Sequence, residues 1–116
     1  MKIFLDTADI EEIRIAARWG VPYARAEDWA GAFATVRANG FRVIALTPDP
    51  EAASIDDYVV ERNARLVLAL GSEGAGLRPG SLRDADVRLR IPIDPRADSL
   101  NVVVAAGIAL KTLLVR

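Results

Sequence analysis

The sequence predicts one α/β domain, spanning residues 1–116, in which a parallel β-sheet carries helices on both faces. Two observations support this prediction. Short apolar runs of strand character alternate with segments of helical periodicity along the whole chain. Two of these runs also end in loops rich in glycine, proline or aspartate, as strands do before they cross over to a helix.

The first 40 residues are predicted to form a strand followed by two helices. Residues 2–6 are a short apolar run and predict a strand. Asp9 and Glu12 then form a capping-box pattern ahead of apolar residues at helical spacing, which predicts a helix up to the next glycine. After a brief extended piece, apolar side chains recur on one face of residues 27–39 and predict a second helix.

The middle of the chain predicts two further strands around a helix. Residues 41–46 are an apolar run, and the two prolines of residues 47–50 require a loop directly after it. Ser54 can cap a helix that we expect at about 55–63. Residues 65–70 form the most apolar run of strand character in the chain.

The last third predicts two helices around one strand. Three glycines between residues 71 and 76 open a loop, and a short helix is expected at 79–85, before a strand at 87–91. A second loop, which contains proline and aspartate, leads to a helix expected at about 99–115. Because Val102–Leu110 is almost wholly apolar, this last helix is predicted to be buried.

The composition excludes several classes of chemistry. The chain has no cysteine and no histidine, so disulfides, thiolate catalysis, Cys/His metal sites and imidazole bases are ruled out, and we expect no metal. No apolar run reaches the roughly 18 residues that a membrane span needs, and acidic residues interrupt the start too early for a signal peptide. A cytoplasmic protein without membrane contact is therefore expected.

The charge balance limits how the chain can bind nucleic acid. The net charge is −1, so RNA binding would depend on a local arginine patch rather than on the field of the whole molecule. Lysine occurs only at Lys2 and Lys111, and the other 13 basic residues are arginines. Arginine suits phosphate contacts, but codon bias in a GC-rich genome is the interpretation that we favour.

The two loops are the candidate ligand site. Glycines at 71, 74 and 76 would let the backbone approach a ligand closely, although such loops often serve only to turn the chain. Asp98 and Ser99 are ordinary candidates to cap the last helix. Asn101 is expected in its first turn, where an apolar side chain would pack better, so it is a candidate polar site residue.

In order and spacing, the two loops resemble the second and third motifs of the SpoU/TrmH-type RNA 2′-O-ribose methyltransferases, which belong to the knotted SPOUT class. The resemblance covers about residues 21–113. It implies a C-terminal trefoil knot that holds S-adenosylmethionine, or S-adenosylhomocysteine after transfer. The positions that it assigns to the cofactor are Thr47, Gly71, Gly76, Ile91 and Leu100. The positions that it assigns to polar residues near the reacting ribose are Glu73, Ser99 and Asn101.

The same resemblance implies a homodimer and an RNA substrate, but it also implies that one part is missing. Members of the family usually take the ribose proton with an arginine from an Asn-x-Gly…Arg stretch on the amino-terminal side, and no such stretch occurs here. Methyl transfer is therefore expected to be weak or lost, and RNA binding to be weak. An intact enzyme stays open as an alternative if Arg25, Arg96 or an arginine from a second copy replaces the missing one.

Residues 1–20 resemble something different, the first strand and helix of the transaldolase and fructose-6-phosphate aldolase family. Four of the nine isoleucines fall within these 20 residues, which marks a shift in composition near residue 20. Asp6 matches an acidic residue of the aldolase site, but neither lysine is placed to form a Schiff base, so aldolase activity is not expected. The sequence thus suggests a chimeric or engineered chain, and an α/β scaffold with no activity is the alternative to a cofactor-binding protein.

Overall fold

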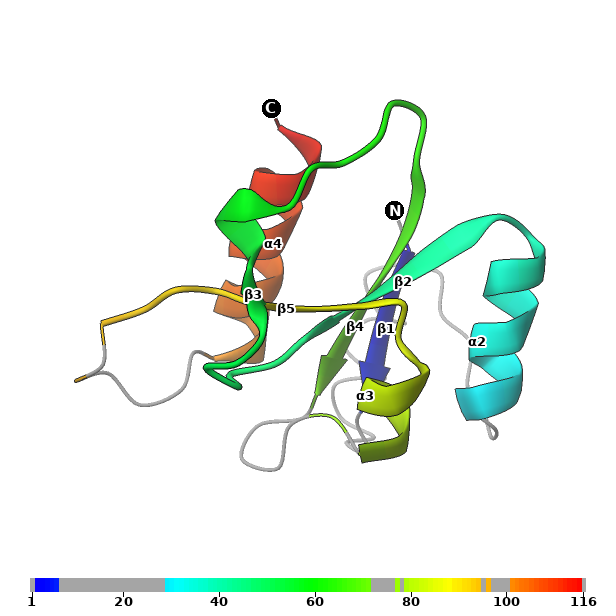
Figure 1. Ribbon diagram of the computed structural model, residues 1–116, viewed down its shortest axis with the longest axis horizontal. Helices are drawn as coiled ribbons and strands as arrows, with labels where there is room; N and C mark the ends of the chain where they lie inside the picture. Colours follow the sequence, from blue (N-terminus) through cyan, green and yellow to red (C-terminus); the bar gives the residue numbers. More distant parts are fainter. Residues whose placement is uncertain are drawn as a thin grey trace, which may run out of the picture.

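A computed structural model of the chain describes residues 2–6, 29–71, 77, 79–94, 96 and 101–115. In this part of the chain the strands form one parallel sheet with the order β1-β4-β2-β5-β3 (Figure 1). Parallel neighbours need a crossover connection, which explains why helices separate most of the strands in the sequence. The strands are β1 (Lys2–Asp6), β2 (Phe41–Leu46), β3 (Ala53–Ser54), β4 (Arg65–Gly71) and β5 (Val87–Arg90).

Helices cover both faces of this sheet, as predicted. Successive residues of β4 point to opposite faces, and residues 66–70 are each at most 4% exposed, so both faces of the strand are covered. The helices α4 (Val102–Leu114) and η1 (Ile55–Asp57) contribute to the cluster that contains Leu68. The helices α2 (Trp29–Ala38) and α3 (Pro79–Asp84) lie on the opposite face, with Val67 (Figure 1).

The helix α2 is anchored by aromatic packing and ends at a glycine. Phe33 is fully buried, and the ring of Trp29 meets it edge to face with 5.7 Å between the ring centroids. Gly40, two residues past the helix, has a φ of +82°, which a residue with a side chain rarely adopts. The chain therefore turns there and enters β2 at Phe41, the residue at which the sequence predicts the strand.

The predicted helix at 55–63 is wrong. Ser54 does act as a cap, since its hydroxyl accepts a hydrogen bond from the amide of Asp56, but only one turn of 3₁₀ helix follows. Tyr58 and Val60 then pack against the α4 side of the core, while Val59 between them is 77% exposed. This alternation is typical of an extended chain. Core packing with a period of two replaces the helix, and β3 directly precedes it.

The last helix differs from its prediction in two ways. It begins at Val102 instead of about residue 99, and it is not buried along the run to Leu110. Only Ala109 and Leu113 of α4 are buried, because a helix on a sheet covers one stripe of its surface. Five outward side chains are large and apolar, and they are Val103, Val104, Ile108, Leu114 and Val115, exposed by 37–74%.

The remaining predictions agree with the structure within one or two residues at the ends of β4, α3 and β5. The predicted helix between Asp9 and Gly20 and the extended piece at 21–23 lie outside the described residues. So do parts of both loops on which the predicted knot depends, namely residues 72–76, 95 and 97–100.

Candidate functional site

The parallel register brings the ends of three neighbouring strands to one edge of the sheet. Ala45 of β2 pairs with Ala69 of β4, so Thr47 and Gly71 lie two residues further along adjacent strands. The amide of Thr47 donates a hydrogen bond of 2.9 Å to the carbonyl of Leu89 on β5, and Ile91 follows two residues later. Three predicted site positions from distant parts of the sequence therefore lie in one row. In open α/β sheets such a carboxyl edge is where ligands bind.

Local hydrogen bonds hold the loop after β2 in shape. The hydroxyl of Thr47 accepts a hydrogen bond of 3.2 Å from the amide of Asp49, and the carboxylate of Asp49 accepts one of 2.9 Å from the amide of Glu51. Prolines at 48 and 50 restrict the same backbone further. The half-buried Thr47 is thus presented at the edge of the sheet by a loop that needs little reordering when a ligand binds.

Gly71 and Ile91 complement Thr47 chemically. Gly71 ends β4, is half-buried, and has no side chain to cover the backbone groups at the strand end. Ile91 is also half-buried and packs against the core beside α4, so it offers part of an apolar surface at a defined position. A ligand with an apolar ring and polar edges suits such a combination of main-chain groups and one aliphatic side chain.

Asp6 is a site-edge residue that the sequence did not predict. It ends β1 and pairs in register with Gly71. The sequence assigns Asp6 only to the end of a strand, because the aldolase-like segment lacks a partner lysine. Recognising its place required the order of the strands in the sheet, which puts β1 next to β4.

The second loop contains a tight local ion pair. The carboxylate of Asp94 accepts hydrogen bonds from Nη2, Nε and the backbone amide of Arg96, at 2.7, 3.0 and 2.8 Å. The side-chain bond first, and then the backbone bond, lower the pKa of Asp94 below its ordinary value. The link is therefore complete above the usual pKa of an aspartate and is lost only as the pH falls through the lowered pKa of Asp94.

The same pair involves Arg96, one of the two arginines considered as a replacement base. Its hydrogen bond to Asp94 raises the pKa of the Arg96 guanidinium, so this group holds its proton more tightly than an ordinary arginine. A general base has to accept a proton near the working pH. Arg25, the other arginine considered from the sequence, lies outside the described residues.

Asn101 caps α4. Its Oδ1 accepts a hydrogen bond of 2.8 Å from the amide of Val103, and its carbonyl accepts one of 2.9 Å from the amide of Ala105. The sequence assigned the capping role to Asp98 or Ser99, but Asn101 is the cap. The prediction that Asn101 lies inside the first turn of the helix is therefore wrong. A polar residue at this position therefore has a structural reason.

The other predicted site residues cannot be placed. Glu73, Gly76, Ser99 and Leu100 lie outside the described residues. Within the part of the chain that the structure covers, no group of three or more acidic side chains could bind a metal ion. The described helices are also all too short or too polar to cross a membrane.

Comparison with known proteins gives a consistent result. The model of the SpoU rRNA Methylase family matches residues 5–111. An uncharacterised tRNA/rRNA methyltransferase of Mycobacterium tuberculosis is 43% identical over 90 residues, 77% of this chain and 31% of that protein. A 23S rRNA (guanosine-2′-O-)-methyltransferase of a Burkholderia species is 34% identical over 90 residues, 78% of this chain and 35% of that protein. The chain thus spans about a third of the length of these relatives.

Solved structures agree with this result. The crystal structure of an AdoMet-bound rRNA methyltransferase from Sinorhizobium meliloti has a TM-score of 0.76 and 31% identity, with 96% of this chain and 44% of that chain covered. A TrmH/SpoU tRNA modifying enzyme of A. aeolicus has a TM-score of 0.75 at 24% identity, and covers 96% of this chain and 58% of its own. At that identity the second match supports the fold alone.

The cap at Asn101 predicts a stability effect that depends on one oxygen atom. Asn101→Ala should lower the free energy of unfolding by about 0.5–2 kcal/mol, because the Val103 amide loses its acceptor. Asn101→Asp retains an accepting oxygen and adds a negative charge at the helix start, so it should cost little. Urea unfolding followed by circular dichroism measures both values. An equal loss in the two variants would contradict the capping role.

Proposed function

Since the chain belongs to the SpoU rRNA Methylase family, we propose that it is the cofactor-binding body of an RNA 2′-O-ribose methyltransferase. The observation that carries this proposal is the row formed by Gly71, Thr47 and Ile91 at the carboxyl edge of three adjacent parallel strands. Gly71 ends β4, whereas Thr47 and Ile91 follow β2 and β5, and the family resemblance assigns all three to one cofactor.

The cofactor that we propose for this edge is S-adenosylmethionine, or S-adenosylhomocysteine as the product. The relative from Sinorhizobium meliloti was solved with AdoMet bound. Main-chain groups near Gly71 can bind the edge of the adenine, and Ile91 can pack against its face. Thr47 would lie at the rim on a loop that is already ordered. Gly76 and Leu100 complete the proposed contacts in the two loops.

The cofactor supplies an activated methyl group, so the protein has two tasks. It must hold the ribose hydroxyl in line with the sulfonium, which is a matter of positioning. It must also help a proton to leave, a contribution typically worth about 10²–10⁴-fold. We propose Glu73, Ser99 and Asn101 near the ribose. Since residues 1–116 contain no Asn-x-Gly…Arg stretch, we expect this body by itself to transfer the methyl group slowly.

We further propose that residues 1–20 replace the family's own strand and helix with an equivalent unit of another α/β fold. The shift in composition near residue 20 supports this origin, and β1, the strand of this segment, lies parallel to β4 at the edge of the sheet. The family match itself begins at residue 5, so the replaced unit would resemble the original in pattern. We expect the C-terminal trefoil knot to persist, because the strands and loops that form it follow residue 20.

A second copy of the chain is the partner that we propose for α4. Its outward face is apolar at Val103, Val104 and Ile108, which are exposed by 74, 50 and 37%. Gly107 lies between them, and no atom would lie within 4 Å of a Cβ placed there. Exposed apolar surface with a small residue at its centre allows close helix-to-helix approach. A homodimer through α4 would bury this face.

Calorimetric titration with S-adenosylhomocysteine tests the cofactor site. We expect a dissociation constant of about 1 μM, equivalent to about −8 kcal/mol. Gly71→Val should abolish the heat of binding, since its side chain would cover the strand end. Val59→Ala, on the loop after η1, is the control and should bind normally, because Val59 is 77% exposed and lies outside the proposed site. No heat even at millimolar ligand for the unaltered chain would contradict the proposal and favour the inactive scaffold.

Transfer of a tritiated methyl group to bulk ribosomal RNA tests whether the catalytic base is missing. The chain should incorporate label about 10²–10⁴-fold more slowly than the relative from Sinorhizobium meliloti, because one proton-transfer group is absent. Equal rates would contradict the predicted impairment and point to another residue as the base.

Sedimentation velocity tests the dimer. Val104→Lys places a charge in the centre of the α4 face and should shift the chain from dimer to monomer. Val59→Lys is the matched control, since Val59 is 77% exposed and lies on the loop after η1. A monomer without any substitution, or equal effects of the two, would rule out α4 as the interface.

A further inference from the structure

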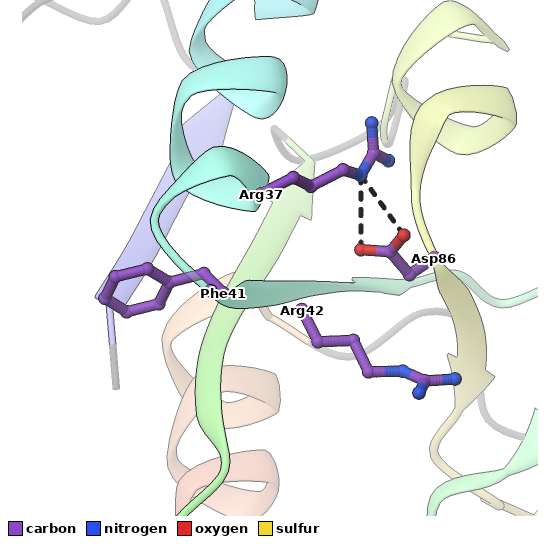
Figure 2. A pocket seen from close by; sticks show the side chains of 5 residues that line it. Arg37, Phe41, Arg42 and Asp86 are labelled. Carbon is purple, nitrogen blue, oxygen red and sulfur yellow. Dashed lines mark hydrogen bonds and ion pairs between the residues drawn. The ribbon is translucent and has the colours of Figure 1, made fainter.

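A groove lies at the amino-terminal edge of the sheet, opposite the candidate cofactor site. It is an open depression of about 500 Å³, lined by Arg37, Gly40, Phe41, Arg42 and Asp86 (Figure 2). The six residues of β2 separate the two edges by about 20 Å, at roughly 3.3 Å per residue. The groove is therefore a separate feature of the molecule, and no part of the function proposed above uses it.

Asp86 fixes the position of Arg37. The Nε of Arg37 lies 3.1 and 3.3 Å from the two carboxylate oxygens of Asp86, and Asp86 also accepts a hydrogen bond of 2.7 Å from the amide of Val43 (Figure 2). The carboxylate is thus bound to the start of β2 and holds the guanidinium from one side. The terminal amino groups of Arg37 make no hydrogen bond within the described part of the chain, so they can bind an anion.

Two more arginines border the same edge. Arg42 is exposed, and its guanidinium has no hydrogen bond or ion pair to any described residue. Figure 2 shows Arg37 and Arg42 on opposite sides of β2, with Asp86 beside them. Arg65 stacks on the ring of Phe41 at 4.2 Å, and its Nη1 donates to the carbonyl of Asn39. Phe41 pairs with Arg65 across the ladder, and Arg65 Nη1 lies 3.8 Å from the position of a Cβ at Gly40, so the third guanidinium lies at the same edge, outside the lining of the groove.

The charges of this edge do not cancel. The guanidinium groups of Arg37, Arg42 and Arg65 lie along this edge with one carboxylate, that of Asp86, which contacts Arg37, so two positive charges are left. The acids of the flanking loops, Glu61 and Asp84, each have an arginine next to them in the sequence. Although the net charge of the chain is −1, this edge is locally basic. A local arginine patch is what RNA binding by such a chain would require.

We propose that Arg37, Arg42 and Arg65 form a binding surface for the phosphate backbone of RNA, called the arginine edge below. This inference rests on the proposed function, which supplies RNA as the substrate. Guanidinium groups bind phosphate oxygens through two parallel hydrogen bonds, and two of the three are already held in place by protein contacts. Such contacts position the strand without reading its bases. A strand that reaches both edges would extend over about 20 Å of sheet.

Fluorescence anisotropy of a labelled oligouridine at several salt concentrations tests the arginine edge. Arg42→Ala leaves the fold intact, because the side chain is exposed and has no described partner. It should reduce the slope of log affinity against log salt by about 0.7 and weaken binding about fivefold at 0.1 M salt. Arg83→Ala is the matched control. Arg83 is exposed on α3, and its Nη2 lies 3.7 Å from the position of a Cβ at Gly80, so it stays over its own helix.

Equal slopes for Arg42→Ala and Arg83→Ala, or no binding of oligouridine by the unaltered chain, would overturn the arginine edge. Binding of inorganic pyrophosphate as tightly as oligouridine would identify a site for free phosphate and would overturn it as well. Titration of Arg42→Ala with S-adenosylhomocysteine separates the two proposals, because cofactor binding should be unchanged. If the unaltered chain does not bind S-adenosylhomocysteine, the proposed function is refuted instead.

Discussion

The parallel pairing of β4 with both of its neighbours determines everything else in this structure. Residues 66–70 of β4 are buried on both faces, so the strand can be covered only by helices on either side. Parallel strands connected through helices place all their carboxyl ends at one edge of the sheet and all their amino ends at the other. The two edges therefore receive different loops and different chemistry.

The two edges divide the work that we propose for the protein. At the carboxyl edge, Gly71 and Ile91 offer main-chain groups and one aliphatic side chain, which suit a neutral adenosyl group better than a phosphate. At the amino edge, Arg65 stacks on Phe41, and the carboxylate of Asp86 holds Arg37 and accepts a hydrogen bond from the amide of Val43. One sheet can then hold a cofactor and its nucleic acid without competition between their charges.

Local patterns predicted most elements because their causes are local. Four of the five apolar strands, flanked by glycine or proline, appear where expected, and the family resemblance assigned Thr47, Gly71 and Ile91 to one cofactor site. The helix at 55–63 failed because Tyr58 and Val60 bury themselves with a period of two against α4. The outward face of α4 was missed because an apolar run does not reveal which of its sides has a partner.

The sequence alone determined the class of fold, every strand except β3, and the loops at the carboxyl edge of the sheet, since periodicity and turn residues act over a few positions. Tertiary structure decided which residues meet. It paired Asp6 with Gly71, and it brought Arg37, Arg42 and Asp86 together across up to 49 residues of sequence. The order of the strands determines which of these residues become neighbours. That order depends on how both faces of the whole sheet are covered, and a local sequence pattern does not reveal this.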